Sequence, residues 1–117
     1  MIKLVYVVRK RKDVSEKDFH EYWLKKHGPL VRSFAKAMRA KKYVQSHTVF
    51  EDAGKQIRAT RPRMTETYDG ITEVWWDNLE DFSSGGDPKE RAEAARALLE
   101  DESKFVDFER SSIFLTE

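Results

Sequence analysis

The sequence predicts an α+β fold in which helices cover a four-stranded antiparallel sheet. Segments rich in β-branched and aromatic residues alternate with amphipathic segments in the order strand, helix, strand, strand, helix, strand. This order is the split βαβ pattern, βαββαβ, of ferredoxin-like domains. The chain has 117 residues, the size of one compact domain. We therefore expect a single domain spanning residues 1–117.

The first strand is expected at Ile2 to Arg9, where Val and Ile dominate. Both faces of this segment are largely apolar, as in a strand that is covered on each side. Ser15 then provides a good N-cap, with Asp18 three residues later in a near match to a capping box. The opening helix is expected to begin there.

The opening helix has one aromatic face that ends in a histidine. Phe19, Trp23 and His27 recur every four residues and so lie in one row along the helix. We expect Gly28 and Pro29 to end the helix, because glycine readily takes the left-handed conformation and proline cannot continue the hydrogen-bond ladder.

The remaining elements follow from the same periodicities. A second helical segment is expected at Leu30 to Met38, further strands at Lys42 to Phe50 and Asp69 to Trp76, a helix at Pro88 to Asp101 and a last strand at Ser111 to Leu115. Helices on one face of such a sheet would leave the other face to a second copy. This arrangement is a dimeric α/β barrel, so we expect a homodimer.

The segment from Glu51 to Thr67 has no clear period and carries several basic residues. It is longer than common hairpin loops of about 2 to 5 residues. We interpret it as a lid or a disordered loop, and a third hypothesis is that its arginines dock on another protein.

Composition excludes several classes of function. A net charge of +1 argues against nucleic-acid binding by phosphate neutralisation. The chain has no cysteine, which excludes disulfides and thiolate chemistry. It also lacks an apolar run of membrane-spanning length and a nucleotide-binding glycine pattern. We expect a soluble cytoplasmic protein that needs no cofactor and binds neither membrane nor nucleic acid.

His27 and His47 are the candidate catalytic residues, because an unperturbed histidine pKa of about 6.5 suits proton transfer near neutrality. If the second strand turns Tyr43, Gln45 and His47 towards the opening helix, both imidazoles could share one cavity. The alternative for His27 is a structural interaction with the helix dipole.

Aromatic and polar residues around these histidines could bind an apolar or aromatic ligand. Glu73 is a further candidate, since burial would raise the pKa of its carboxyl, although a solvated position or a salt bridge is an alternative. The candidate substrate-binding residues are Trp23, Tyr6, Tyr43, Gln45, Glu73 and Trp75. His27, His47 and Glu73 could together hold a metal, but three dispersed ligands without a motif are common by chance, so no metal is expected.

Four segments together resemble the EthD family of dimeric α+β-barrel proteins: FHEYWLKKHGPLV, YVQSHTVF, YDGITEVWWDNLEDF and SKFVDF. The most specific parts are Trp23 and His27 followed by Pro29, the Tyr43 to His47 segment, and the Asp-Gly-Ile start of the third strand. The resemblance covers nearly the whole chain. It implies a ferredoxin-like homodimer with a small-molecule pocket between sheet and helices.

The resemblance does not fix a reaction. Similar proteins are associated with ether degradation beside an oxygenase system, or with polyketide tailoring as dehydratases, decarboxylases or cofactor-free oxygenases. Our hypothesis is a cofactor-free enzyme, an oxidoreductase or a lyase, acting on an aromatic, polyketide-like or carbonyl-bearing substrate. The alternative is a non-catalytic ligand-binding or accessory protein that supports a partner oxygenase.

Overall fold

The computed structural model describes residues 1–117 and contains one antiparallel sheet. Its strands are β1 (Ile2–Val8), β2 (Lys42–His47), β3 (Gly70–Trp76) and β4 (Ser112–Thr116), in the order β2-β3-β1-β4. The long connections after β1 and β3 carry the covering helices. The predicted ferredoxin-like α+β fold is therefore confirmed.

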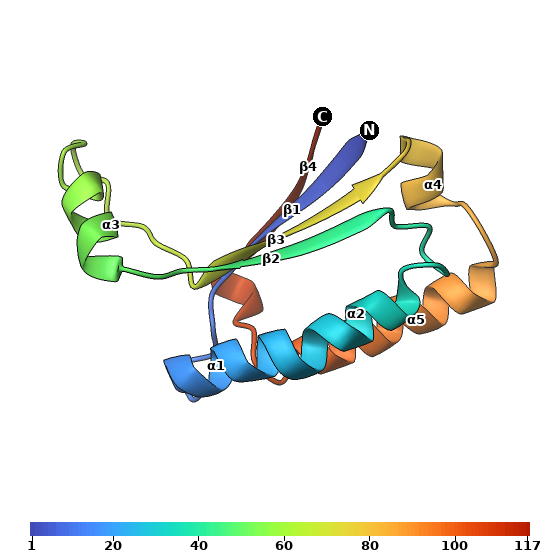
Figure 1. Ribbon diagram of the computed structural model, residues 1–117, viewed down its shortest axis with the longest axis horizontal. Helices are drawn as coiled ribbons and strands as arrows, with labels where there is room; N and C mark the ends of the chain where they lie inside the picture. The colour runs from blue at the N-terminus through green and yellow to red at the C-terminus, as the bar shows by residue number, and fades with distance from the viewer.

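One layer of helices covers one face of the sheet (Figure 1). It consists of α1 (Glu16–Tyr22), the π-helical turn η1 (Trp23–His27), α2 (Gly28–Phe34) and α5 (Pro88–Glu102). The N-cap prediction for the first helix is confirmed, since the Ser15 hydroxyl accepts a hydrogen bond from the Asp18 amide at 3.1 Å. The short helix α4 (Leu79–Ser83) lies at one end of the sheet, and the 3-10 turn η2 (Phe108–Arg110) leads into β4.

The prediction that Gly28 and Pro29 end the first helix is wrong. Gly28 is right-handed helical, with φ −55° and ψ −52°, and its amide donates to the Trp23 carbonyl five residues earlier. Because of this wide π-turn, α1, η1 and α2 form one continuous helical rod from Glu16 to Phe34. Pro29 falls in the first turn of α2, where a missing amide hydrogen is tolerated. His27 therefore lies within a continuous rod rather than at its end.

The core forms where this rod crosses β1. Val8, Phe19, Trp23, Phe105 and Val106 pack together as one buried cluster. The third strand begins with glycine beneath the Trp23 ring, and a Cβ atom on Gly70 would lie 2.4 Å from that ring. The close approach of rod and sheet thus requires glycine at this position.

Two segments differ from the sequence predictions. The second helical segment ends at Phe34 rather than Met38, and Arg39 takes a left-handed φ of 59°. The segment from Glu51 to Thr67 contains a helix, α3 (Glu51–Arg58), that was not predicted. Its eight residues give too few repeats to establish a period, and none of them is buried. Figure 1 shows α3 projecting away from the body as an arm.

No helix covers the opposite face of the sheet (Figure 1). The strand register pairs Val5 with Phe114 and Val7 with Ile71. The side chains of both pairs face away from the helix layer. Phe114 is 47% exposed. This is the face that we expected a second copy of the chain to cover. No helix in the structure has the length and apolar character needed to cross a membrane.

Candidate functional site

A cavity of about 150 Å³ lies between the sheet and the helix layer. Of the 15 residues that line it, 12 are hydrophobic. Cavities of about this volume can hold one six-membered ring. Six of the lining side chains carry a polar N–H or oxygen group: Tyr6, Trp23, His27, Tyr43, Thr72 and Glu102. An apolar chamber with a few converging polar groups is typical of a small-molecule site.

A carboxylate behind the cavity orients His27. The Nδ1 atom of His27 lies 2.8 Å from Oδ2 of Asp101 on α5. Burial lowers the pKa of His27 and outweighs the opposing effect of Asp101, so the imidazole is neutral at pH 7. A neutral ring that donates from Nδ1 keeps a lone pair on Nε2. Nε2 makes no hydrogen bond within the chain and is the free base of this pair.

Both carboxylate oxygens of Asp101 accept hydrogen bonds. Tyr22 donates its hydroxyl hydrogen to Oδ1, while His27 contacts Oδ2. Burial raises the pKa of Asp101, but these two hydrogen bonds outweigh burial and bring the pKa below its usual value. The ionised carboxylate therefore fixes the tautomer of His27, as a carboxylate does behind many catalytic histidines.

Glu102 is the second titratable group on the cavity wall. Burial raises the pKa of its carboxyl to about 7, although the nearby Tyr6 hydroxyl acts in the opposite direction. Burial, together with Glu102, also raises the pKa of Tyr6. Glu102 thus carries a proton over part of the neutral range, and the Tyr6 hydroxyl stays protonated.

The site therefore combines a neutral base and a protonated acid in one apolar chamber. His27 is a base above its lowered pKa, and Glu102 is an acid below a pKa of about 7. Two groups whose environments push their pKa values apart in this way are typical of acid–base catalysis.

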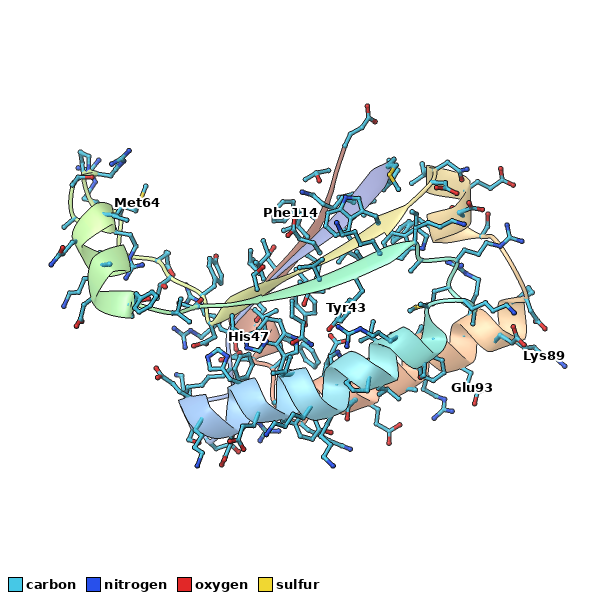
Figure 2. All side chains as sticks on the ribbon, viewed as in Figure 1. Tyr43, His47, Met64, Lys89, Glu93 and Phe114 are labelled. Carbon is cyan, nitrogen blue, oxygen red and sulfur yellow. The ribbon has the colours of Figure 1, made fainter.

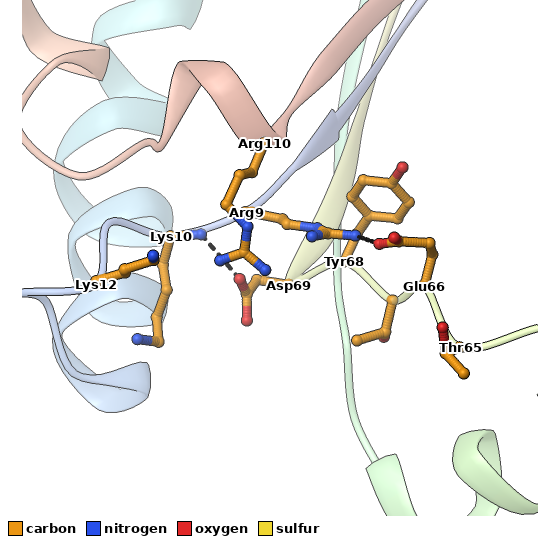
Figure 3. Close-up of a pocket in the computed structure, with 9 residues that line it drawn as sticks. Arg9, Lys10, Lys12, Thr65, Glu66, Tyr68, Asp69 and Arg110 are labelled. Carbon is orange, nitrogen blue, oxygen red and sulfur yellow. Dashed lines mark hydrogen bonds and ion pairs between the residues drawn. The ribbon is translucent and has the colours of Figure 1, made fainter.

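A second hollow, of about 220 Å³, lies where the arm rejoins the sheet, and it is mostly charged (Figure 3). Its Arg9 side chain pairs with Glu66 and stacks over the Tyr68 ring at 4.7 Å. Asp69 accepts from the Lys10 amide at 2.8 Å. Only one of the nine residues that line this hollow is hydrophobic, so we take the apolar cavity between the sheet and the helices as the candidate site.

The model of the EthD domain family matches residues 11–109. The chain belongs to the EthD family. Among curated proteins, none matches this EthD chain.

Solved structures agree with the fold of this EthD domain. An ethyl tert-butyl ether D (EthD) family protein of Bacillus halodurans superposes with a TM-score of 0.67 at 19% identity, covering 100% of this chain and 97% of that one. An EthD-like protein of Ralstonia eutropha superposes with a TM-score of 0.62 at 13% identity. The match covers 99% of this chain and 90% of that one. A dimeric ferredoxin-like protein of unknown function from Thermobifida fusca superposes with a TM-score of 0.51 at 12% identity. The match covers 98% of this chain and 88% of that one.

The structure brings only part of the predicted site of this EthD domain together. Of the eight predicted residues, four line the cavity: His27, Trp23, Tyr6 and Tyr43. His47 does not share this cavity with His27. Instead His47 lies between β2 and the first helix (Figure 2). Its ring packs on Trp23, at 4.3 Å between centroids, and contacts His20. Gln45 lies between His47 and Tyr43.

The other two predicted residues lie on the uncovered face of the sheet. Glu73 pairs with Lys3 at 3.0 Å, the salt bridge considered as its alternative, and Trp75 lies beneath the Lys3 and Lys42 ammonium groups. His27, His47 and Glu73 are thus placed in three separate environments.

Sequence reasoning missed Asp101 and Glu102 at the end of α5. The helix was predicted to end at Asp101, and its weakly apolar pattern gave no reason to bury two consecutive acids. One available signal was their spacing from Leu98, since residues three and four apart share a helix face. Leu98 and Glu102 both line the cavity.

Proposed function

We propose that this EthD protein is a cytoplasmic, cofactor-free enzyme that moves a proton within a small carbonyl-bearing substrate enclosed in the cavity. The observation that carries the proposal is that His27, held by Asp101 with Nε2 free, lines the same cavity as Glu102, whose pKa burial raises to about 7. At pH values above the lowered pKa of His27 and below the pKa of Glu102, about 7, His27 is free to act as a base while Glu102 still carries its acidic proton.

In the proposed step, His27 Nε2 takes a proton from the carbon next to the carbonyl, and Glu102 gives its proton to the carbonyl oxygen. The product is the enol, and return of both protons restores the enzyme. The same two transfers serve isomerisation. In dehydration, His27 takes the proton from the α-carbon while Glu102 gives its proton to a hydroxyl on the β-carbon, which leaves as water. Desolvation in the apolar chamber strengthens each electrostatic interaction.

Hydrogen–deuterium exchange at the α-carbon tests this proposal without knowledge of the natural substrate. Cyclohexanone and small aromatic ketones would be incubated with the protein in D₂O near neutral pH and followed by NMR. We expect the protein to accelerate exchange, and His27→Asn and Glu102→Gln to abolish the acceleration. Asparagine keeps a donor to Asp101 but supplies no base.

Glu100→Gln is the matched control, because Glu100 lies on the same helix but its side chain is 71% exposed. This variant should exchange α-hydrogens at the wild-type rate. Acceleration that persists in His27→Asn would contradict the proposal.

The second candidate function is a non-catalytic binding protein, and the apolar lining of the cavity favours it. Such a protein would hold an apolar or aromatic ligand for a partner oxygenase. Native mass spectrometry that finds a bound ligand, with no exchange or conversion across the ketone panel, would favour this role over the enzyme.

We further propose that the protein is a homodimer that buries the uncovered face of its sheet. The exposed Phe114 and the half-buried Ile71 and Trp75 lie on this face. Burial of apolar surface stabilises association by about 25 cal/mol per Å². The Thermobifida fusca relative is described as dimeric.

A further inference from the structure

A row of hydrogen bonds runs from His20 on α1, through His47 and Gln45 on β2, to Tyr43 on the wall of the cavity. His20 Nδ1 lies 2.7 Å from His47 Nδ1, and His47 Nε2 lies 2.8 Å from Gln45 Oε1. Gln45 Nε2 lies 2.7 Å from the Tyr43 hydroxyl and 2.8 Å from the Trp23 carbonyl oxygen. Within this row, only Tyr43 and Trp23 line the cavity.

The Trp23 carbonyl fixes the direction of the whole row. A carbonyl oxygen only accepts, so the amide nitrogen of Gln45 must be the atom that faces it. The amide oxygen of Gln45 then faces His47, and His47 must carry a hydrogen on Nε2. Glycine at position 28 leaves room for this arrangement, because a Cβ atom on Gly28 would lie 3.0 Å from Gln45 Nε2.

The outer end of the row is determined in the same way. A neutral His47 with its hydrogen on Nε2 has only a lone pair on Nδ1. His20 must therefore donate its own hydrogen from Nδ1. The two rings lie 4.9 Å apart between centroids, and His47 also packs on Trp23, so this geometry is held by packing as well as by hydrogen bonds.

At the inner end of the row, the Tyr43 hydroxyl is free to donate its hydrogen. Both hydrogens of the Gln45 amide are used, one by Trp23 and one by Tyr43. The Tyr43 oxygen accepts, so its own hydrogen must point elsewhere, and no group of the chain accepts it. Burial raises the pKa of Tyr43, which keeps this hydrogen in place over the neutral range.

We propose that His47 and Gln45 are positioning residues that hold Tyr43 as a hydrogen-bond donor to an acceptor oxygen of the ligand. The cavity then selects a carbonyl compound over a hydrocarbon of the same shape. This inference rests on the proposed occupancy of the cavity by a small molecule, but it does not require catalysis. In the proposed reaction, the same donor stabilises the oxygen of the enol as charge develops there.

Long-range ¹⁵N–¹H NMR of the wild-type protein at pH 8 tests the direction of the row. We expect His47 to carry its hydrogen on Nε2 and His20 to carry its hydrogen on Nδ1, the tautomer that a free imidazole disfavours. The result that would overturn the assignment is a hydrogen on Nδ1 of His47. This measurement needs no variant, so a folding defect cannot obscure it.

Ligand titrations by NMR test the role of Tyr43. The probes are cyclohexanone and methylenecyclohexane, which differ only in C=O against C=CH₂. We expect Tyr43→Phe to weaken cyclohexanone binding about fivefold, the value of one neutral hydrogen bond, and to leave methylenecyclohexane binding unchanged. Tyr68→Phe is the matched control, because Tyr68 lies outside the cavity.

Two variants of His47 separate positioning from packing. His47→Phe keeps a ring on Trp23 but loses the donor to Gln45, so the preference for the ketone should fall as in Tyr43→Phe. His47→Gln restores a donor near the same place and should recover the preference.

The outcomes distinguish this inference from the proposed function. Equal affinity of the wild type for the two probes, or a ketone preference that survives in Tyr43→Phe, overturns the role of Tyr43. An intact preference without α-hydrogen exchange counts against catalysis alone. Failure of both probes to bind overturns both proposals, since each requires an accessible cavity.

Discussion

His27 and Asp101 lie 74 residues apart in the sequence, yet Nδ1 and Oδ2 are separated by only 2.8 Å. The contact joins the first helical rod to α5 directly behind the cavity. It is buried, since the two side chains are 7% and 11% exposed. The pair therefore links the packing of two helices to the chemistry of the site.

Asp101→Asn should change both stability and proton transfer. The new amide can accept from Tyr22 and direct its nitrogen towards His27, which forces the imidazole to carry its hydrogen on Nε2. We expect loss of α-hydrogen exchange and a free energy of unfolding lower by about 1 to 3 kcal/mol. Exchange by NMR and urea denaturation measure the two effects. Asp13→Asn removes an exposed pair with Arg11 and should change neither by a measurable amount.

Glu102→Gln should alter the pH dependence of stability. The folded-state pKa of Glu102 is about 7 against an ordinary 4.5, so the native protein binds the extra proton and stability falls as pH rises through this window. Each pKa unit corresponds to about 1.4 kcal/mol. Between pH 4 and pH 8 we expect the wild type to lose about 2 to 3 kcal/mol more than the variant. Parallel urea-denaturation curves for the two proteins across this range would contradict the raised pKa.

Gly70→Ala should displace Trp23 from the sheet. The added methyl group would lie 2.4 Å from the Trp23 ring and 2.6 Å from the Ser46 carbonyl oxygen, and the latter is backbone that cannot move aside. We expect a loss of about 1 to 3 kcal/mol in the free energy of unfolding, as for other overpacked cores, with altered tryptophan fluorescence. Gly54→Ala is the control, because its methyl would meet only the flexible ends of side chains, Arg58 at 3.3 Å and Glu51 at 3.8 Å. An equal effect of the two substitutions would argue against the close contact.

The sequence was sufficient for those features that depend on local periodicity. The strand alternation and the stripe through Phe19, Trp23 and His27 predicted the sheet and the face that packs on it. The π-turn was not predictable, because it depends on the Trp23 carbonyl accepting from Gly28 and from Gln45, and Gln45 arrives from a different strand.

The candidate site was predicted only in part, for a related reason. Half of the predicted residues line the cavity: the helical row correctly placed Trp23 and His27 on one face, and alternation on β2 correctly turned Tyr43 towards the helices. Asp101 and Glu102 become important only when α5 packs beside the rod and buries them. Long-range burial of a charged residue leaves no local pattern in a single sequence.

Phe114→Lys should dissociate the proposed dimer. Phe114 is 47% exposed on the uncovered face of the sheet and stands opposite Val5 on the neighbouring strand. A second copy that covers this face would have to bury the new ammonium group, and burial of an unpaired charge is strongly unfavourable. We expect sedimentation velocity to give a dimer for the wild type and a monomer for the variant at the same concentration.

The control for this experiment is Leu79→Lys, which also introduces a charge at an exposed apolar residue. Leu79 is 56% exposed but lies on α4, at the end of the sheet. If the uncovered face is the interface, this variant stays dimeric, because its charge remains in solvent. Dissociation of both variants would mean that added charge alone opposes association. A dimer that persists in Phe114→Lys would place the interface elsewhere on the molecule.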